Sequence, residues 1–177
     1  MMKKAVFLDR DGVLNASVVR DGRPYPPDSL KELVILPGVE ETISDLHHAG
    51  FLIIVVTNQP DVARGKQSRE VVEAMHEFLM NRLALDDIKT CFCIEGPGCE
   101  CYKPKPKMLL DAASELNIEL SGSFMIGDRW RDIGAGQAAG CKTFFIDYGY
   151  DEKQPERPDF VVASLFEAGQ IILGKYS

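Results

Sequence analysis

Two aspartates follow the first apolar run of the chain and raise the first question about its chemistry. In the segment FLDRDG, Asp9 and Asp11 lie two residues apart, directly after the apolar residues AVFL. Burying a carboxylate at the end of a core strand is unfavourable unless a partner compensates its charge. Aspartates at this position therefore indicate a metal site, acid–base chemistry, or both.

Further polar residues are expected at the same edge of the fold. Thr57 closes the apolar run FLIIVVT, Asp128 closes SFMIGD, and Lys103 lies in the loop before the helix that leads into SFMIGD. In a parallel sheet covered by helices, ligands bind outside the carboxyl ends of the strands. Each residue alone has a purely structural explanation, but together they predict one site.

Three carboxylates, a hydroxyl and a lysine suit phosphoryl transfer assisted by Mg²⁺. Asp9 and Asp128, with the backbone carbonyl of Asp11, offer the oxygen ligands that Mg²⁺ prefers. Asp9 could attack a phosphate in line and form an aspartyl-phosphate. Asp11 would then act as the general acid and base.

Other residues would hold the phosphoryl group and the metal site in place. Thr57 and the backbone amide of Asn58 would bind phosphoryl oxygens, and Lys103 would supply a fixed positive charge. Asp132 follows Asp128 by four residues at the start of a predicted helix, so it is expected to brace the metal site.

The elements that must position these residues alternate between short β-rich runs and amphipathic stretches. Strands are expected at KAVFLD, FLIIVVT, residues 88–92, SFMIGD, KTFFIDY and PDFVVAS, and helices after Pro37-Gly38, after Ser68, over residues 106–117, over RWRDIGAGQAAG and at the end of the chain. VVRDGRPY predicts a small hairpin that turns at Asp21-Gly22. Residues 1–177 are therefore expected to form one doubly wound, Rossmann-like α/β domain, with helices on both faces of a parallel sheet and no large cap domain.

The helix after Ser68 is expected to begin at that residue as its cap. Its buried face is predicted to comprise Val71, Met75, Phe78, Leu79 and Leu83. The three histidines, His47, His48 and His76, have no evident ligand partners in the sequence, and we expect them to be surface or packing residues.

The net charge of the chain limits the kinds of molecule that it is expected to bind. Twenty Lys and Arg against twenty-seven Asp and Glu give a net charge of −7, which argues against a nucleic-acid surface. The first apolar run has four residues, too few for a signal peptide or a membrane span. We expect a cytoplasmic protein that acts on a small molecule as a monomer or small oligomer, the monomer being favoured.

Four of the five cysteines crowd into CFCIEGPGCEC. Two Cys-x-Cys pairs across a Gly-Pro-Gly turn could deliver Cys91, Cys93, Cys99 and Cys101 to a tetrahedral Zn²⁺. Such a small zinc-stabilised loop would fix the position of Lys103. Two disulfides or four unrelated thiols are the alternatives, although a reducing cytoplasm disfavours disulfides. Cys141 is expected to be a small buried side chain.

DRDGVLN, TNQ, KPKPKML and IGDRWRD, in this order, resemble the four motifs of the haloacid dehalogenase (HAD) phosphatase superfamily. DRDG and the cysteine loop make the chain similar to the family of D-glycero-D-manno-heptose-1,7-bisphosphate 7-phosphatases, which is closely related to histidinol phosphatases. The resemblance implies removal of the 7-phosphate, with histidinol phosphate or another small sugar phosphate as the alternative substrate. It also implies Asp9 as nucleophile, Asp11 as acid/base and Asp128 as Mg²⁺ ligand.

The resemblance further implies a set of substrate contacts: Arg10, Asn58, Gln59, Arg64, Tyr102, Lys105 and Arg129. Tyr102 occupies a position where the family typically has an arginine that binds the second phosphate, and tyrosine cannot copy that bidentate contact. Lys105 or Lys107 could supply the charge instead. Cys93 stands where the family usually has histidine.

Two other function classes share parts of this pattern. A receiver domain also uses Asp, Thr, Lys and Mg²⁺, but its acceptor aspartate follows the third strand, whereas no acidic residue follows IKTCF here. A zinc-bearing interaction domain without catalysis would retain the cysteine loop and hydrolyse nothing.

Overall fold

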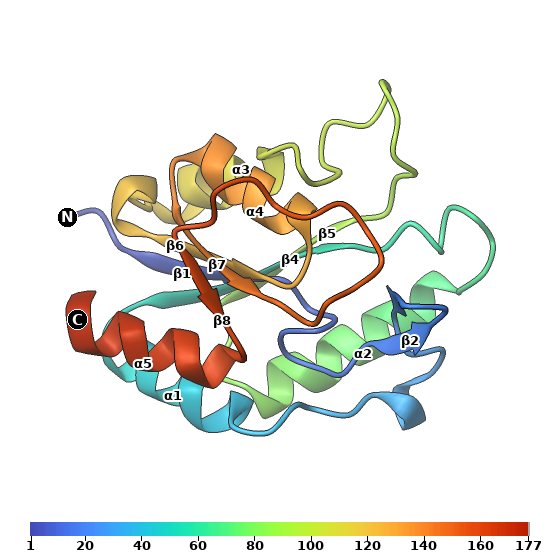
Figure 1. Ribbon diagram of the computed structural model, residues 1–177, viewed down its shortest axis with the longest axis horizontal. Coiled ribbons are helices and arrows are strands. Elements are labelled where there is room, and N and C mark those ends of the chain that lie inside the picture. Colours follow the sequence, from blue (N-terminus) through green and yellow to red (C-terminus); the bar gives the residue numbers. More distant parts are fainter. Residues whose placement is uncertain (177) are drawn as a thin grey trace.

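The computed structural model describes residues 1–176 and has a parallel six-stranded sheet at its centre (Figure 1). The strand order is β5-β4-β1-β6-β7-β8. The bounds are Ala5–Leu8 for β1, Leu52–Asn58 for β4, Asp87–Cys91 for β5, Phe124–Gly127 for β6, Lys142–Ile146 for β7 and Phe160–Val162 for β8. The order reverses at β1, so a crevice forms beyond its carboxyl end. The predicted doubly wound sheet is confirmed.

Helices cover both faces of this sheet. Helices α1 (Val39–His48), α2 (Arg69–Arg82) and α5 (Leu165–Tyr176) lie on one face, and α3 (Lys107–Leu116) and α4 (Trp130–Ala139) lie on the other (Figure 1). Short 3₁₀ turns occur at Leu30–Glu32 and Leu120–Gly122. Alternate residues of β1 are buried in the two cores, Val6 and Leu8 in one and Ala5 and Phe7 in the other. This alternation follows from the two-residue period of a strand.

The predicted hairpin follows β1. Strand β2 (Val18–Arg20) pairs antiparallel with β3 (Arg23–Tyr25). The turn residues Asp21 and Gly22 both have positive φ, 49° and 73°, as a two-residue hairpin turn requires. The amide of Asp151 donates to the Gly22 carbonyl at 2.9 Å, so the hairpin tip is attached to the loop after β7.

The predicted face of α2 is partly wrong. Ser68 is the cap, as expected, because its hydroxyl accepts from the Val71 amide at 3.2 Å. The buried residues of the helix, however, are Val72, Met75 and Leu79, whereas Phe78 is 39% exposed. The spacing of 72, 75 and 79 turns a neighbouring stripe of the helix towards the sheet, and Phe78 falls outside it.

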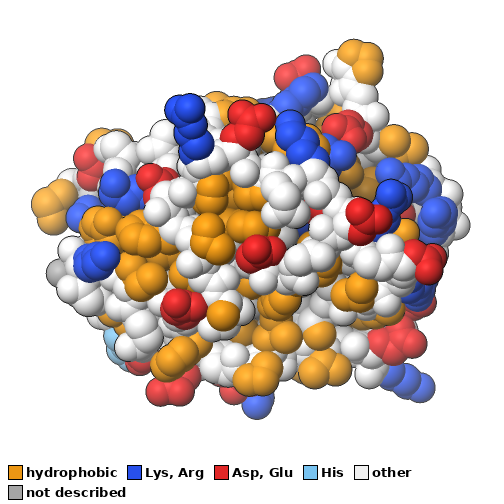
Figure 2. All heavy atoms as spheres, viewed as in Figure 1, with side chains coloured by type: hydrophobic (Ala, Val, Ile, Leu, Met, Phe, Trp, Pro, Cys, Tyr) orange, Lys and Arg blue, Asp and Glu red, His pale blue; other side chains and the backbone are white. Residues whose placement is uncertain are grey.

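The surface carries charges of both signs. In Figure 2 acidic and basic side chains are interspersed with apolar ones on the face shown. Across residues 1–176, none of the helices has both the length and the apolar character needed to cross a bilayer.

Phe124 on β6 is the centre of an aromatic cluster, and we expect its truncation to destabilise the fold strongly. It is 2% exposed, and its ring centroid lies 5.8 Å from that of Phe51, 6.0 Å from that of Phe144 and 5.2 Å from that of Tyr176. Phe124→Ala should lower the unfolding free energy by about 3–5 kcal/mol, measured by urea denaturation. Phe78→Ala is the matched control, with an expected loss below about 1 kcal/mol; equal losses would contradict the assignment of the core.

Candidate active site

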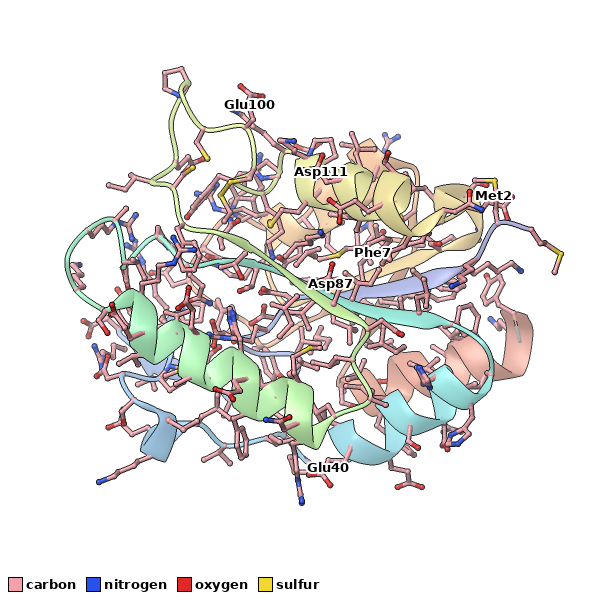
Figure 3. The ribbon with its side chains drawn as sticks, turned by 180° about the vertical axis from the view of Figure 1, so that it is seen from behind. Met2, Phe7, Glu40, Asp87, Glu100 and Asp111 are labelled. Carbon is pink, nitrogen blue, oxygen red and sulfur yellow. A yellow bond between two sulfur atoms is a disulfide. The ribbon has the colours of Figure 1, made fainter. Side chains whose placement is uncertain are left out.

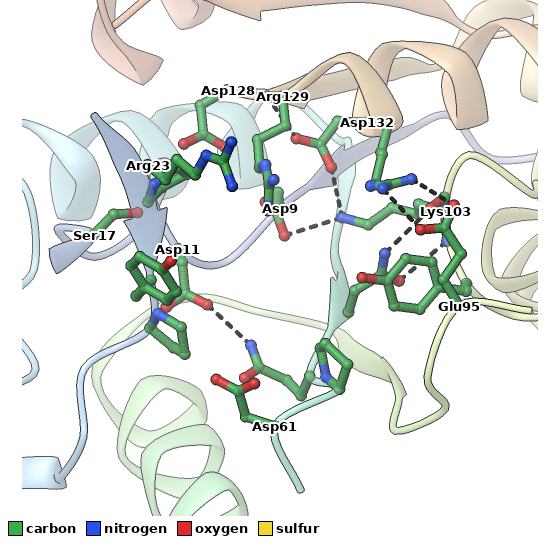
Figure 4. Close-up of a pocket in the computed structure, with 18 of the residues that line it drawn as sticks. Asp9, Asp11, Ser17, Arg23, Asp61, Glu95, Lys103, Asp128, Arg129 and Asp132 are labelled. Carbon is green, nitrogen blue, oxygen red and sulfur yellow. Dashed lines mark hydrogen bonds and ion pairs between the residues drawn. The ribbon is translucent and has the colours of Figure 1, made fainter. Parts of the chain in front are cut away.

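A pocket of about 290 Å³ lies where the ends of β1, β4 and β6 meet the hairpin and the cysteine loop (Figure 4). Most of the predicted site residues line it: Asp9, Asp11, Asn58, Gln59, Arg64, Tyr102, Lys103, Asp128, Arg129 and Asp132. The structure therefore brings together residues up to 123 positions apart in the sequence.

Lys103 lies at the centre of the charged residues and is 2% exposed. Its ammonium donates to Asp9 Oδ1 at 3.0 Å, to Asp132 Oδ1 at 2.6 Å and to the Val56 carbonyl at 2.8 Å (Figure 4). Burial lowers the pKa of Lys103, but Asp132 and Asp9 outweigh burial and raise it, so the side chain stays charged. The Lys103 amide also donates to Asn58 Oδ1 at 3.1 Å, which ties this loop to the end of β4.

Three carboxylates converge beside this lysine and fit a divalent cation. Asp9, Asp128 and Asp132 have oxygen atoms within 4.8 Å of one another. Asp128 Oδ1 is buried and has no hydrogen-bond partner among residues 1–176. This oxygen is therefore free to coordinate a metal ion. Burial, then the charges of Asp9 and Asp132, raise the pKa of Asp128 well above its usual value. A hard cation with oxygen ligands such as Mg²⁺ would reverse that penalty.

The two flanking carboxylates differ in how far they are already satisfied. Both oxygens of Asp132 are engaged, one by Lys103 and the other by the Arg129 amide at 3.0 Å, so it braces the site. Asp9 Oδ1 accepts from Lys103 and from the Arg10 amide at 2.8 Å. Its Oδ2 makes no hydrogen bond or ion pair within residues 1–176. Burial and the Asp132 charge raise the pKa of Asp9 to about 6, although Lys103 opposes the shift.

Two residues that were not predicted from the sequence determine the position of the Asp128 carboxylate: Tyr150 donates a hydrogen bond to it, and Gly12 leaves room for it. Tyr150, in the loop after β7, donates its hydroxyl to Asp128 Oδ2 at 2.9 Å. Gly12 has a φ of +83°, and a Cβ built on it would lie 1.9 Å from Asp128 Oδ2. Only glycine leaves room for the carboxylate. The sequence pattern DRDG could have signalled Gly12, but no local signal marks Tyr150.

Asp11 stands apart from the carboxylate cluster, on the opposite side of the pocket (Figure 4). Its Oδ1 accepts from Arg10 at 3.0 Å and Asn15 at 2.9 Å, and its Oδ2 from Gln59 at 3.0 Å. Burial raises the pKa of Asp11, but the Arg10 charge and these hydrogen bonds outweigh it, so the pKa lies below its usual value. The side chain of Asp11 therefore does not join the metal cluster, and only its backbone carbonyl remains a predicted ligand.

The structure places Arg10, a predicted substrate contact, behind Asp11 and not on the pocket surface. Its guanidinium is fully buried, pairs with Asp11, and lies 3.1 Å from Nε2 of His76 on α2. His76 is thus a packing residue, as expected, and its ring contacts the Arg10 guanidinium on the side away from the pocket. Burial, then the Arg10 charge, lower the pKa of His76 to about 4, so its ring is neutral.

Two more predicted residues lie outside the pocket surface. Thr57 is fully buried, and its hydroxyl oxygen accepts from Gln59 Nε2 at 3.0 Å. The Lys105 ammonium donates to the Cys99 carbonyl and lies 3.9 Å from a Glu100 carboxylate oxygen. In this structure Lys105 therefore contacts the cysteine loop and does not line the pocket.

The pocket walls carry further charges, most of them paired. Arg129 pairs with Glu152, and Arg131 makes two 2.8 Å contacts with Glu95. Arg131 also lies over the ring of Tyr102, 5.5 Å from its centroid. Glu152, Glu95 and Arg131 were not predicted from the sequence, because their contacts depend on loops whose paths the sequence pattern does not specify.

The cysteine loop gathers its four sulfur atoms within 4.8 Å of one another. The Sγ atom of Cys99 lies 3.6 Å from Sγ of Cys91 and 3.7 Å from Sγ of Cys101, and Sγ of Cys93 lies 3.7 Å from Sγ of Cys101. A tetrahedron of zinc-bound sulfurs with Zn–S distances near 2.3 Å has edges of about 3.8 Å. Cys91 and Cys101 form a disulfide here (Figure 3), whereas the sequence predicted four thiolates that share one Zn²⁺, with two disulfides as an alternative. Zinc fits the arrangement once that bond is reduced.

Comparison with known proteins places the chain in a family. A family model described as HAD-hydrolase-like matches residues 100–168. The chain is 36% identical to the D-glycero-beta-D-manno-heptose-1,7-bisphosphate 7-phosphatase of Pasteurella multocida, with 98% of each chain covered. The chain belongs to the heptose-bisphosphate phosphatase family. The member of this family from Vibrio cholerae is 38% identical over 81% of this chain and 80% of its own.

A solved structure of the heptose-bisphosphate phosphatase family agrees in fold. The D,D-heptose 1,7-bisphosphate phosphatase from B. bronchiseptica, complexed with magnesium and phosphate, superposes with a TM-score of 0.79 at 28% identity. The match covers 97% of this chain and 99% of that one. The family resemblance predicted from the four motifs is confirmed.

His76 should make the protein sensitive to acid. In the unfolded chain it takes up a proton near pH 6.5, whereas in the fold its pKa is about 4, so stability falls as the pH drops through this window. Between pH 7 and pH 5, wild type should lose about 1–2 kcal/mol more unfolding free energy than His76→Gln, measured by urea titration. The exposed His48→Gln should behave as wild type. Equal pH dependence of wild type and His76→Gln would contradict this.

Proposed function

We propose that this protein is a Mg²⁺-dependent phosphomonoesterase that removes the 7-phosphate of D-glycero-D-manno-heptose 1,7-bisphosphate. The observation that carries the proposal is the Lys103 ammonium between Asp9 and Asp132, beside an unpartnered oxygen of Asp128. Relatives at 36% and 38% identity that bear this activity in their names supply the substrate.

Asp9 is the nucleophile in this proposal. Lys103 and the Arg10 amide hold its Oδ1, which leaves Oδ2 to attack phosphorus and form an aspartyl-phosphate as the sugar oxygen departs. Lys103, the Asn58 amide and the Thr57 hydroxyl would bind the phosphoryl oxygens. Mg²⁺, held by Asp9, Asp128 and the Asp11 carbonyl, would neutralise charge on the transferring group.

Asp11 is the proposed acid and base. Arg10, Asn15 and Gln59 hold its carboxylate by hydrogen bonds, and the Arg10 charge and these hydrogen bonds lower its pKa, which favours the deprotonated form before substrate binds. An arriving phosphate dianion raises the pKa of a neighbouring carboxyl group, which favours the proton that Asp11 must give to the departing sugar oxygen. The deprotonated form then takes a proton from the water that hydrolyses the aspartyl-phosphate.

One observation favours a second candidate substrate. Tyr102 places an aromatic ring on the pocket wall, under the Arg131 guanidinium. An aromatic wall suits a flat heterocycle better than a phosphate, so histidinol phosphate is the alternative. Comparing kcat/KM on the two substrates separates them.

We propose that the protein acts as a monomer. We also propose a cytoplasmic location, where the cysteine-loop thiols would remain reduced.

Removing the nucleophile should abolish turnover. Asp9→Asn keeps the shape of the side chain, and phosphate release from heptose 1,7-bisphosphate should fall by at least about 10³-fold. Omitting Mg²⁺ should have a comparable effect on wild type. Asp111→Asn changes an aspartate on α3 that pairs with Lys107 outside the pocket and should retain wild-type activity. Turnover retained by Asp9→Asn would exclude the covalent mechanism.

The cysteine loop should hold zinc. Protein purified under reducing conditions should contain about one zinc ion per chain, measured by elemental analysis. Cys99→Ser should lose the zinc and unfold at a lower temperature, whereas Cys141→Ser, outside the cluster, should keep it. Zinc-free wild-type protein, or zinc retained by Cys99→Ser, would contradict the assignment.

A further inference from the structure

The pocket is lined by cations beyond those that face the reacting phosphoryl group. The hairpin contributes Arg23, the loop between β4 and α2 contributes Arg64 and Lys66, and α4 contributes Arg131. Figure 2 shows basic side chains over the loop between β4 and α2. Three separate walls thus each place a positive charge at the pocket of a protein whose net charge is −7.

The three arginines on these walls differ in their partners. Arg64 pairs with Asp61 at 3.2 Å, and Arg131 pairs with Glu95 at 2.8 Å. Arg23 makes no ion pair and no side-chain hydrogen bond within the described part of the chain, residues 1–176. An exposed arginine keeps its hydration, so its unpaired charge costs little and remains available to a ligand.

The fold fixes where Arg23 stands. It is the first residue of β3, after the Asp21-Gly22 turn, and the hairpin tip is attached through Asp151. Figure 4 shows its guanidinium directed from the hairpin into the pocket. Arg20, directly across the hairpin, is instead held by Asp28 at 3.0 Å and does not line the pocket.

We infer that Arg23 binds a second anionic group of the substrate, distinct from the phosphoryl group that Asp9 attacks. The reacting phosphoryl group is served by deeply buried residues, with Thr57 fully buried and Lys103 2% exposed. Arg23 stands on the exposed wall, where it could meet the remote end of a bound sugar phosphate. Lys66 also lacks an ion pair within residues 1–176, but only a guanidinium binds phosphate through two parallel hydrogen bonds, so Arg23 is the residue expected to select bisphosphates.

This inference rests on the proposed phosphatase function and gives Arg23 the task for which Tyr102 is unsuited. The neutral ring of Tyr102 lies under Arg131, whose charge Glu95 already compensates. Arg23 therefore carries the selectivity from a different wall of the pocket.

The test compares two substrates that differ only in the second phosphate: D-glycero-D-manno-heptose 1,7-bisphosphate and D-glycero-D-manno-heptose 7-phosphate. Fructose 1,6-bisphosphate and fructose 6-phosphate form a second pair, and p-nitrophenyl phosphate reports the reaction itself. Arg23→Gln should lower the ratio of kcat/KM for bisphosphate over monophosphate by about 10- to 100-fold, since hydrogen bonds to charged groups contribute this much. Arg23→Lys should give an intermediate ratio, because lysine keeps the charge without the two-pronged geometry.

Arg20→Gln is the matched control, because it removes the same charge from the same hairpin outside the pocket. It should retain the wild-type ratio. An unchanged ratio in Arg23→Gln, or equal losses in both variants, would overturn the inference.

Failure of the inference is distinguishable from failure of the proposed function. Wild-type protein that hydrolyses p-nitrophenyl phosphate with Mg²⁺ but prefers neither bisphosphate over its monophosphate would reject the role of Arg23 alone. Absence of Mg²⁺-dependent hydrolysis of every substrate would reject both.

Discussion

The site depends on one buried ammonium group. Lys103 contacts Asp9 and Asp132 at the edge of the sheet where three carboxylates lie within 4.8 Å of one another. Without a buried cation, such a cluster could not stay ionised, because like charges at this distance repel strongly in a medium of low polarity. The lysine reaches this position because its backbone is hydrogen-bonded to Asn58. One charge thus joins the ends of β1 and β4 to the start of α4.

The walls of the pocket differ from its floor in the elements that form them and in how their charges are paired. The floor consists of strand ends and is buried, whereas the walls come from the hairpin, the loop after β4 and the cysteine loop. Wall charges are mostly neutralised within the wall itself, as in Arg131–Glu95 and Arg64–Asp61. This arrangement separates the chemistry, which tolerates little change, from recognition, which depends on exposed side chains.

Much of the fold and the floor of the site could be predicted from the sequence, because both follow from short-range patterns. Apolar runs ending in Asp9, Thr57 and Asp128 specify parallel strands, and the carboxyl ends of such strands meet by topology. The walls could not be predicted in this way. The family resemblance implies Arg10 as a substrate contact, yet its side chain turns inwards to Asp11 and His76.

The same limit applies to residues that act through distant partners. Tyr150 reaches Asp128 from a loop without regular structure, and the pairing is visible only in three dimensions. Phe78 was placed in the core because helical spacing leaves two neighbouring stripes nearly equivalent, and packing against the sheet decides between them.

The absence of a side chain at Gly12 has an evolutionary consequence. A methyl group there would occupy the space of the Asp128 carboxylate, and the positive φ adds backbone strain for any other residue. Positions 12 and 128, which lie 116 residues apart in the sequence, are therefore not free to vary independently. A lineage that lost the glycine would first have to replace the Asp128 carboxylate with a smaller side chain, so a single substitution at position 12 is not accommodated by this backbone.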